Sequence, residues 1–391
     1  MKEFIEGSMA VARGVAVCRP HVVSAYPITP QTHIVEHLSE MVADGDLDSQ
    51  FINVESEFGA ASVVLGAAAA GGRSYSATTS QGLLLMGEVL FNIAGLRLPI
   101  SITVANRAVS APINIWNDHS DAMVFRDAGW IMLFAEDNQE VHDMQIQAYK
   151  IGENPEIMLP VLVNMDGFIL THAYETVETI SQKEADDFLP PFKPEYYLDV
   201  NKPITMGVLG DPNYYLETRY SLQEAIDESR DVVKQVAREF KEKFGRWYGD
   251  LIDTYRTEDA DTVFVAMGSL VGTIKDTVDE LRDKGEKVGL LKIRCYRPWP
   301  GEEVVESLKN IDNVIVLEKA VSLGASGMMA DEIKASLFDT PHRPKISNFF
   351  IGLGGRDIPK ESLIKVYNQV KEKPQYNQFV DLKPELLEYP S

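Results

Sequence analysis

Cysteine is the scarcest chemically useful residue in this sequence of 391 residues. Only Cys18 and Cys295 are present, and they form no Cys-x-x-Cys pair. A chain with so few thiols cannot by itself hold an iron–sulfur cluster or a cysteine-based zinc site, so we expect no metal centre in this chain. So few cysteines also fit a reducing compartment.

Positive charge and long apolar runs are also in short supply. The chain has 37 Lys and Arg against 59 Asp and Glu, a net charge of −22. This excess of acid argues against nucleic-acid binding and against binding to anionic membranes. No apolar run reaches the roughly 18 residues of a membrane span, and no charged-then-apolar leader opens the sequence. We therefore expect a cytoplasmic protein with no nucleic-acid or membrane partner.

Phosphate-binding loops are missing as well. The sequence has neither the six-residue glycine fingerprint of dinucleotide folds nor a Walker-type Gly-Lys-Ser/Thr loop. Its glycines at 268, 324 and 352–355 follow predicted strands, where turns require them. What is present is an ordinary globular composition, 45% hydrophobic and 25% charged, with length enough for two or three domains.

The first half of the sequence alternates strands and helices. The pattern predicts strands near 21–28, 51–54, 74–78, 99–105, 131–135 and 157–164. It predicts helices over 3–17, 30–42, 60–71, 80–94, 121–129 and 140–152. Such alternation indicates an α/β fold with a parallel sheet that is covered on both faces.

Five polar residues follow the predicted strands directly: Thr29, Glu57, Ser80, Arg107 and Asp166. In parallel α/β sheets, ligands bind outside the carboxyl ends of the strands, so these side chains are candidates for one binding edge. Turns from strand to helix prefer polar residues in any case, which leaves a structural explanation open. In particular, Thr29-Pro30 has the form of a helix N-cap followed by a first-turn proline.

Glu55 and Glu57 precede a helix of unusually small residues, 60–71. That helix has little side-chain bulk and suits close approach to another surface. A carboxyl group at its start would be partly desolvated and suited to sharing a proton with a heterocycle. The alternative is that Glu57 only complements the positive N-terminus of the helix.

The second half of the sequence begins with a break in periodicity. From about 174 to 219 the chain is polar and proline-rich, and we predict an extended connection that wraps another surface. A charged helix over about 221–244 follows, and strands and helices alternate again from about 260. The predicted domains are 1–200 and 257–391, joined by an extended and helical connector over 201–256.

Nine stretches in order resemble the α chain of the 2-oxoacid:ferredoxin oxidoreductases, most closely the multi-subunit pyruvate:ferredoxin oxidoreductases. They are residues 26–30, 55–60, 79–86, 105–108, 114–121, 165–168, 266–269, 292–298 and 352–357, including Tyr-Pro-Ile-Thr-Pro and Glu-Ser-Glu-Phe-Gly-Ala. The resemblance implies two doubly wound domains of the transketolase-like type found in thiamine-diphosphate enzymes. The first would be the pyrimidine-type domain and the last the transketolase C-terminal-like domain.

The resemblance also implies roles for five residues. Glu57 occupies the place of the catalytic glutamate that binds the pyrimidine ring of thiamine diphosphate, and Glu55 is read as supporting or structural. Arg107 matches the arginine that binds the substrate carboxylate, and Thr29 matches a threonine that hydrogen-bonds the substrate oxygens. Ser80 is predicted to contact the cofactor. A structural ion pair for Arg107 and a plain N-cap for Thr29 remain alternatives.

The polar loop after Arg107 carries Asp118, His119 and Asp121. These side chains could relay protons, since histidine titrates in the physiological range. They could also pin the loop by hydrogen bonds, which we favour. Asp166 matches the family pattern as well, although it could simply satisfy a turn.

The family's Gly-Asp-Gly motif for the diphosphate and Mg²⁺ is absent here, as are cluster cysteines. The resemblance therefore implies partner chains: a β chain with the diphosphate and Mg²⁺ site, a ferredoxin-like chain with [4Fe-4S] clusters, and a γ chain. The implied reaction is oxidative decarboxylation of pyruvate with coenzyme A to acetyl-CoA, CO₂ and reduced external ferredoxin. The alternatives are another 2-oxoacid, such as 2-oxoisovalerate, arylglyoxylate or oxalate, and a scaffold subunit without catalysis.

Overall fold

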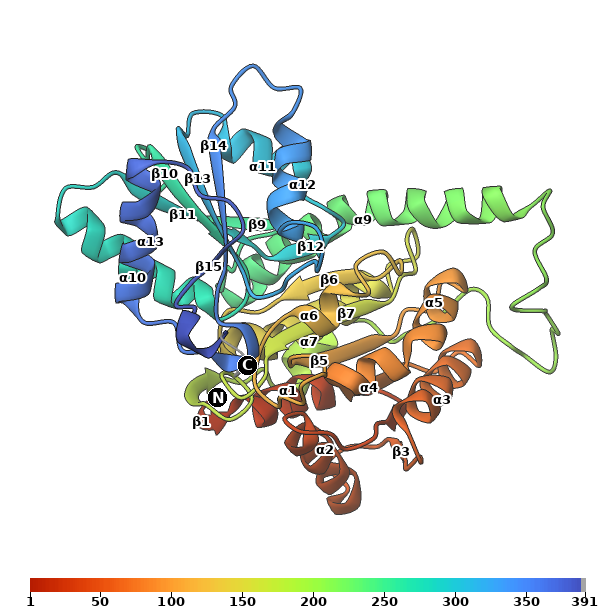
Figure 1. Cartoon of the computed structure of the whole chain (residues 1–391). Coiled ribbons are helices and arrows are strands. Elements are labelled where there is room, and N and C mark those ends of the chain that lie inside the picture. The colour runs from red at the N-terminus through yellow and green to blue at the C-terminus, as the bar shows by residue number, and fades with distance from the viewer. Residues whose placement is uncertain (388–391) are drawn as a thin grey trace. The chain divides into compact units, whose positions relative to one another are not determined.

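The computed structural model describes residues 1–387, which divide into two compact units (Figure 1). The first unit comprises 1–251 and the short return segment 294–300, and the second comprises 252–293 and the chain from 301 onward. Both are α/β units, as predicted. The long helix expected in a separate connector belongs to the first unit, which differs from the three ranges predicted from sequence.

The sheet of the first unit has seven strands in the order β12-β6-β7-β5-β4-β2-β3. All neighbours are parallel except β12, which is antiparallel to β6. The strands are β2 (Val22–Ser24), β3 (Gln50–Ile52), β4 (Ser74–Thr78), β5 (Ser101–Asn106), β6 (Ile131–Phe134), β7 (Val161–Asp166) and β12 (Cys295–Arg297). The chain moves outward from β2 to β3 and then returns to β4. The topological switch point therefore lies between β2 and β4, where α/β sheets bind ligands.

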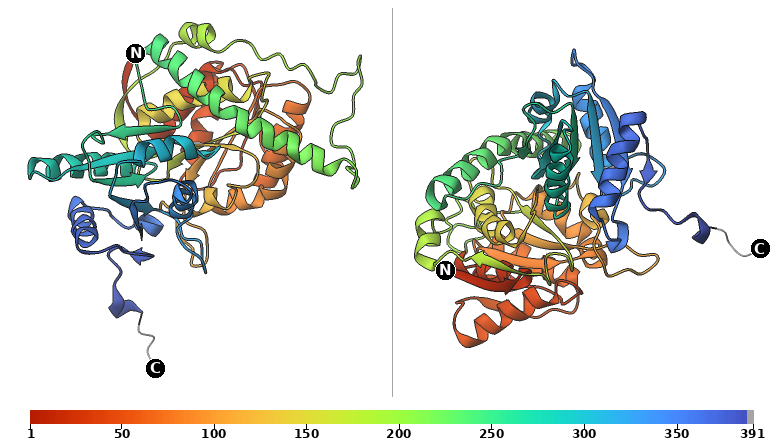
Figure 2. Two further views of the ribbon diagram at one scale, coloured as in Figure 1. Left: turned by 90° about the horizontal axis from the view of Figure 1, so that it is seen from above. Right: turned by 90° about the vertical axis from the view of Figure 1, so that its left-hand side faces the viewer.

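Helices of the first unit pack in two groups. Helix α1 (Gly7–Val17) packs against α2 (Thr32–Asp44) and α7 (Asn138–Gly152), while α3 (Glu57–Ala69) packs on β2, β4 and α5 (Gly87–Gly95). Helix α9 (Tyr215–Phe244) contacts both α5 and α7, and Figure 2 shows it crossing over α7. Two short helices, α4 (Ser80–Leu85) and α6 (Ser120–Met123), contact each other, and α4 also contacts α3 and α5.

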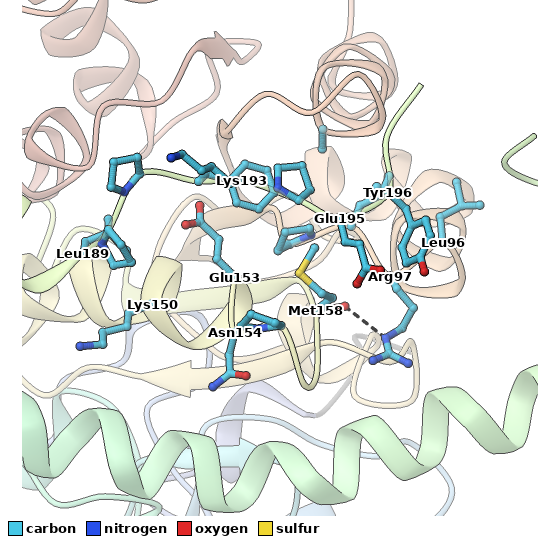
Figure 3. Close-up of a pocket in the computed structure, with 18 of the residues that line it drawn as sticks. Leu96, Arg97, Lys150, Glu153, Asn154, Met158, Leu189, Lys193, Glu195 and Tyr196 are labelled. Atoms are coloured by element: carbon cyan, nitrogen blue, oxygen red, sulfur yellow. Dashed lines mark hydrogen bonds between the residues drawn. The ribbon is translucent and has the colours of Figure 1, made fainter. Parts of the chain in front are cut away.

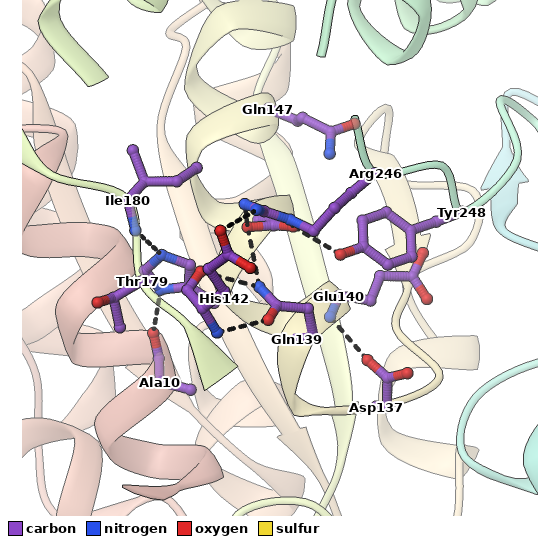
Figure 4. Close-up of polar contacts among 12 residues, drawn as sticks. Ala10, Asp137, Gln139, Glu140, His142, Gln147, Thr179, Ile180, Arg246 and Tyr248 are labelled. Atoms are coloured by element: carbon purple, nitrogen blue, oxygen red, sulfur yellow. Dashed lines mark hydrogen bonds and ion pairs between the residues drawn. The ribbon is translucent and has the colours of Figure 1, made fainter. Parts of the chain in front are cut away.

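Buried polar groups on α7 tie the first unit to its incoming and outgoing chain segments (Figure 4). The Asp143 carboxylate, which is fully buried, accepts hydrogen bonds from Arg246 Nε at 2.5 Å and from the Tyr248 hydroxyl at 2.6 Å. One turn earlier, Glu140 Oε1 accepts from Arg294 Nε at 2.8 Å. Unpaired buried charges would be strongly unfavourable, so these pairs specify where the chain leaves and re-enters the unit.

The second unit has a six-stranded sheet in the order β15-β14-β13-β10-β11-β9, parallel except for the edge pair β9–β11. Its strands are β9 (Ile252–Tyr255), β10 (Thr262–Ala266), β11 (Val288–Ile293), β13 (Asn313–Glu318), β14 (Lys345–Phe350) and β15 (Gln378–Phe379). Its helices are α10 (Leu270–Asp283), α11 (Gly301–Leu308), α12 (Met328–Leu337) and α13 (Lys360–Glu372). A buried apolar core lies between α10, α13 and the central strands.

Several predicted elements are wrong in detail. Residues 2–6 form strand β1 (Lys2–Glu6) instead of the first turns of a helix, because they pair with β8 (Tyr174–Glu178), a partner distant in sequence. The segment expected to be an extended connection contains β8 and α8 (Gln182–Phe188), and α9 begins six residues earlier than the predicted 221. The helix predicted over 80–94 is divided into α4 and α5, and that over 121–129 shrinks to α6.

Candidate functional site

The carboxyl ends of five parallel strands, β2, β3, β4, β5 and β7, meet at one edge of the first sheet. The register pairs Ser24 with Ile52, Thr78 with Val104, and Asn106 with Asp166, so the strands end together. The residues that follow them are therefore gathered at this edge, as the alternation of the sequence predicted.

Glu57 is the first residue of α3 and is 7% exposed. Ser56 precedes it as the N-cap, with its hydroxyl accepting from the Gly59 amide at 3.3 Å. Within residues 1–387 the Glu57 side chain makes no hydrogen bond or ion pair. Its carboxyl oxygens are not among the enclosed polar atoms that lack a partner, so they are accessible to a ligand at this edge. Glu55, by contrast, is exposed.

Gly82 on α4 creates the space in which the Glu57 side chain lies. A Cβ atom at residue 82 would come within 2.7 Å of Glu57 Oε1 and 2.6 Å of Thr78 Oγ1, closer than non-bonded atoms approach. The Thr78 hydroxyl is buried and has no hydrogen-bond partner in the described part of the chain. Sequence reasoning missed both Thr78 and Gly82, because only the fold brings α3 and α4 together.

Arg107 follows β5, and its guanidinium group is held on three sides. Nε donates to the Asn114 carbonyl at 2.9 Å, Nη1 donates to the Thr29 carbonyl at 2.8 Å, and Nη2 donates to Gln81 Oε1 at 3.3 Å. One N–H on each terminal nitrogen is left without a partner among the described residues, a pair suited to a carboxylate. Burial lowers the pKa of Arg107, and the nearby Asp121 carboxylate opposes that shift.

Thr29 and Ser80 lie beside Arg107, although not as the sequence suggested. Thr29 does not cap a helix: α2 begins at Thr32, and residues 29–31 form a turn that the Gln31 side chain ties to the Ala77 carbonyl at 2.7 Å. The Thr29 side chain is exposed at this edge. Ser80 is fully buried, and its hydroxyl donates to the Ala108 carbonyl at 2.6 Å.

The acidic loop residues after Arg107 are engaged in hydrogen bonds that fix the loop, which agrees with the pinning interpretation. Asp118 accepts from the Ser120 amide at 2.9 Å, and His119 Nε2 lies 2.7 Å from Asp166 Oδ1 with both side chains buried. Asp121 accepts from the backbone amides of Ser80 and Arg107, and burial raises its pKa to about 6.

A separate cavity of about 600 Å³ lies on segments that precede β5 and β7, beneath the proline-rich segment 189–196 (Figure 3). Two of its charged lining residues are already paired: both Glu153 oxygens lie 2.6 Å from Arg73, and Lys150 lies 2.5 Å from Glu239. None of the predicted site residues lines it. The carboxyl edge, which gathers the partnerless Glu57 and the half-engaged Arg107, is therefore the better candidate site.

Neither a metal centre nor a membrane span is apparent in the described chain. No group of three or more His, Cys, Asp or Glu side chains in residues 1–387 is arranged to hold a metal ion. Across the same residues, every helix is too short or too polar to cross a bilayer.

Two family models together match most of the chain. The model described as "Pyruvate flavodoxin/ferredoxin oxidoreductase, thiamine diP-bdg" matches residues 13–238, and that described as "Pyruvate:ferredoxin oxidoreductase core domain II" matches residues 260–363.

Curated relatives cover almost the whole chain. Pyruvate synthase subunit PorA of Methanosarcina barkeri is 52% identical over 98% of this chain and 97% of its own length. The PorA subunit of Methanocaldococcus jannaschii is 48% identical over 94% of each chain. A ketoisovalerate oxidoreductase subunit, VorA of Pyrococcus horikoshii, is 43% identical over 95% of this chain and 94% of its own.

Two solved structures share the fold. The 2-oxoglutarate:ferredoxin oxidoreductase of Magnetococcus marinus superposes with a TM-score of 0.70 at 20% identity, covering 95% of this chain and 65% of that one. A split-gene transketolase superposes with a TM-score of 0.56 at 11% identity, covering 95% of this chain and all of that one. Both likenesses concern the fold alone and agree with the predicted transketolase-like architecture.

Proposed function

Because this chain belongs to the pyruvate flavodoxin/ferredoxin oxidoreductase family, we propose that it is the α subunit of a thiamine-diphosphate-dependent pyruvate synthase. The assembled enzyme converts pyruvate, coenzyme A and two oxidised ferredoxins into acetyl-CoA, CO₂, a proton and two reduced ferredoxins, and the reaction is reversible. The observation that carries this proposal is the buried, partnerless Glu57 beside Gly82, at the edge of the sheet that also holds Arg107.

Glu57 would hold the pyrimidine ring of thiamine diphosphate. When bound, that cofactor supplies the nucleophilic carbon and the electron sink for decarboxylation. The chain's own contribution is a carboxyl group on a largely buried residue at a helix N-terminus, which can exchange a proton with a ring nitrogen. The close approach allowed by Gly82 keeps this carboxyl group in one position.

Arg107 and Thr29 would bind the 2-oxoacid. The two unengaged N–H groups of Arg107 match the two oxygens of a carboxylate, and its other N–H groups are used to fix the guanidinium plane. The Thr29 hydroxyl is exposed beside it and can donate to a substrate oxygen. Ser80 is buried behind this pair, so its contact with the cofactor would be indirect.

Replacement of Glu57 by Gln in the assembled complex tests the proposal. The amide cannot exchange the proton, so we expect pyruvate turnover to fall by about 100-fold or more. Glu55→Gln, a matched change of an exposed neighbour, should have a much smaller effect. Near-normal turnover by the Glu57 variant would support the scaffold alternative and contradict a catalytic role.

Partner chains are part of this proposal. No Gly-Asp-Gly motif and no cluster cysteines occur in the sequence, so we propose a β chain for the diphosphate and Mg²⁺, a chain carrying [4Fe-4S] clusters, and a γ chain. Around Glu57, apolar side chains on β3, α3, α4 and α5 are exposed: Ile52, Phe58, Leu84, Leu85 and Phe91. Such a patch beside a half-formed site suits docking of the β chain.

Substrate choice within the family rests on the pocket lining. A ketoisovalerate oxidoreductase subunit is 43% identical to this chain, as are some pyruvate synthase subunits. Relatives named for pyruvate include those at 52% and 48% identity, which favours pyruvate. Assay of the assembled complex against pyruvate, 2-oxoisovalerate, an arylglyoxylate and oxalate would separate these acids, and pyruvate should have the highest kcat/KM.

A further inference from the structure

The Asp121 carboxylate joins two neighbouring strand ends of the site. Oδ2 accepts from the backbone N–H of Ser80 at 2.9 Å and from that of Arg107 at 3.0 Å. Ser80 directly follows the loop after β4, and Arg107 directly follows β5, which is the parallel neighbour of β4. Oδ1 accepts from Asn106 Nδ2 at 3.0 Å and from the Ala122 amide at 2.7 Å. The side chain is fully buried.

We infer that Asp121 is a positioning residue, which sets the separation between Arg107 and the first turn of α4, where Gly82 receives Glu57. This inference rests on the proposed function. It assigns Asp121 no contact with substrate or cofactor, because all of its hydrogen bonds go to the chain itself.

Ser80 needs such a partner because of its backbone. Its φ of +45° lies in the left-handed region, which is unfavourable for a residue other than glycine. Its amide bonds to the buried Asp121 carboxylate, and an unsatisfied N–H at this buried position would be unfavourable as well. An ionised carboxylate that accepts this amide is therefore well suited to hold the turn.

The effect of Asp121 reaches both halves of the site through α4. Gln81, which follows Ser80, has its Oε1 atom 2.6 Å from the Ser80 hydroxyl oxygen, and the same Oε1 accepts from Arg107 Nη2 at 3.3 Å. Gly82, the next residue, lies against the Glu57 carboxyl group. A displacement of Ser80 would therefore move both Gln81, which accepts from Arg107, and Gly82, which lies against Glu57.

Asp121→Asn in the assembled complex tests the inference. The amide keeps the shape but presents an NH₂ group to at least one N–H donor, so we expect KM for pyruvate to rise at least fivefold and kcat to fall about tenfold. Thiamine diphosphate binding, measured by quenching of intrinsic fluorescence, should weaken as well. A purely structural role would lower the melting temperature and leave KM, kcat and cofactor affinity unchanged in the folded enzyme.

Asp143→Asn provides the matched control. Asp143 is an equally buried carboxylate in the same unit that accepts from Arg246 and Tyr248, with no link to Arg107 or Ser80. Its variant should lose stability while keeping KM for pyruvate. If Asp121→Asn behaves in the same way, the positioning role is refuted.

Asn106→Ala provides a second test if Asp121→Asn does not assemble. This variant removes the side-chain donor to Asp121 Oδ1 and leaves the two backbone amides bonded to Oδ2. We therefore expect KM for pyruvate to rise and kcat to fall by about threefold each. Unchanged KM and kcat in that variant would overturn the inference. An inactive Glu57→Gln enzyme beside a wild-type-like Asp121→Asn enzyme would refute the positioning role alone, whereas an active Glu57→Gln enzyme would refute the proposed function.

Discussion

Two residues that are not expected to contact a substrate shape the candidate site. Gly82 has no side chain and so leaves room for Glu57, and the Asp121 carboxylate accepts hydrogen bonds from two backbone amides. The residues that carry the proposed chemistry, Glu57 and Arg107, depend on them for position. The positions of the proposed catalytic residues therefore depend on neighbouring residues that take no part in the chemistry.

Gly82→Ala is the sharpest residue-scale prediction. The new methyl group would meet the Glu57 side chain and the Thr78 hydroxyl at under 3 Å, so Glu57 must move by a few tenths of an ångström or more. We expect kcat of the complex to fall by about 100-fold with a small change in melting temperature. Gly272→Ala on α10 is the matched control, because no atom lies within 4 Å of its Cβ. Equal activity of the two variants would contradict the role of Gly82.

Helix starts illustrate what an element adds to its residues. In the second unit, Glu318 at the end of β13 accepts from the amides of Met329 at 3.0 Å and Ala330 at 3.1 Å, in the first turn of α12. A side chain from a neighbouring strand thus occupies the anion site of this helix N-terminus. Because Glu318 already accepts these amides, the N-terminus of α12 is not available to bind a phosphate.

The stability of the second unit should depend on pH through Glu318. Burial raises its pKa from 4.5 to about 7, so the folded state holds this proton more tightly than the unfolded chain. The free energy of unfolding should therefore fall as pH rises from about 4.5 to about 7, by up to about 3 kcal/mol. The free energy of unfolding, measured with urea at pH 5 and pH 8, should differ less between the two pH values for Glu318→Gln than for the parent chain. The exposed Glu361→Gln should keep the parental dependence, and an identical slope for both variants would exclude Glu318 as its source.

Elements were predictable from the sequence where local pattern and tertiary packing agree. Strand β6 lies within one residue of its predicted position, because its apolar run is buried on both faces. Residues 2–6 were assigned to a helix because their strand partner, β8, lies far away in sequence. Thr29-Pro30 was read as a helix start, yet the Gln31 side chain bonds to Ala77 and the helix begins at Thr32.

At the scale of the whole molecule, we propose that the chain supplies half of a site. Glu57 has no hydrogen-bond partner within the described residues, and β3, α3, α4 and α5 carry exposed apolar side chains. A surface of this kind is typical of a subunit whose cofactor arrives with another chain.

The purified chain should not turn over pyruvate with an artificial electron acceptor, even with thiamine diphosphate and Mg²⁺ added. Addition of the Gly-Asp-Gly-bearing β chain and the cluster-bearing chain should restore activity, because they supply the diphosphate site and the electron path. Steady-state reduction of a viologen dye would measure this. Clear turnover by the chain alone would contradict the need for partners.

The sequence by itself determined the α/β class, the order of the polar strand ends and the family, because these follow from local periodicity and from contiguous motifs. It could not determine how Glu57, Gly82, Arg107 and Asp121 meet, since their contacts join separate strand ends. Only the tertiary structure decided that, because parallel pairing brings strand ends to one edge and burial then requires every amide there to find an acceptor.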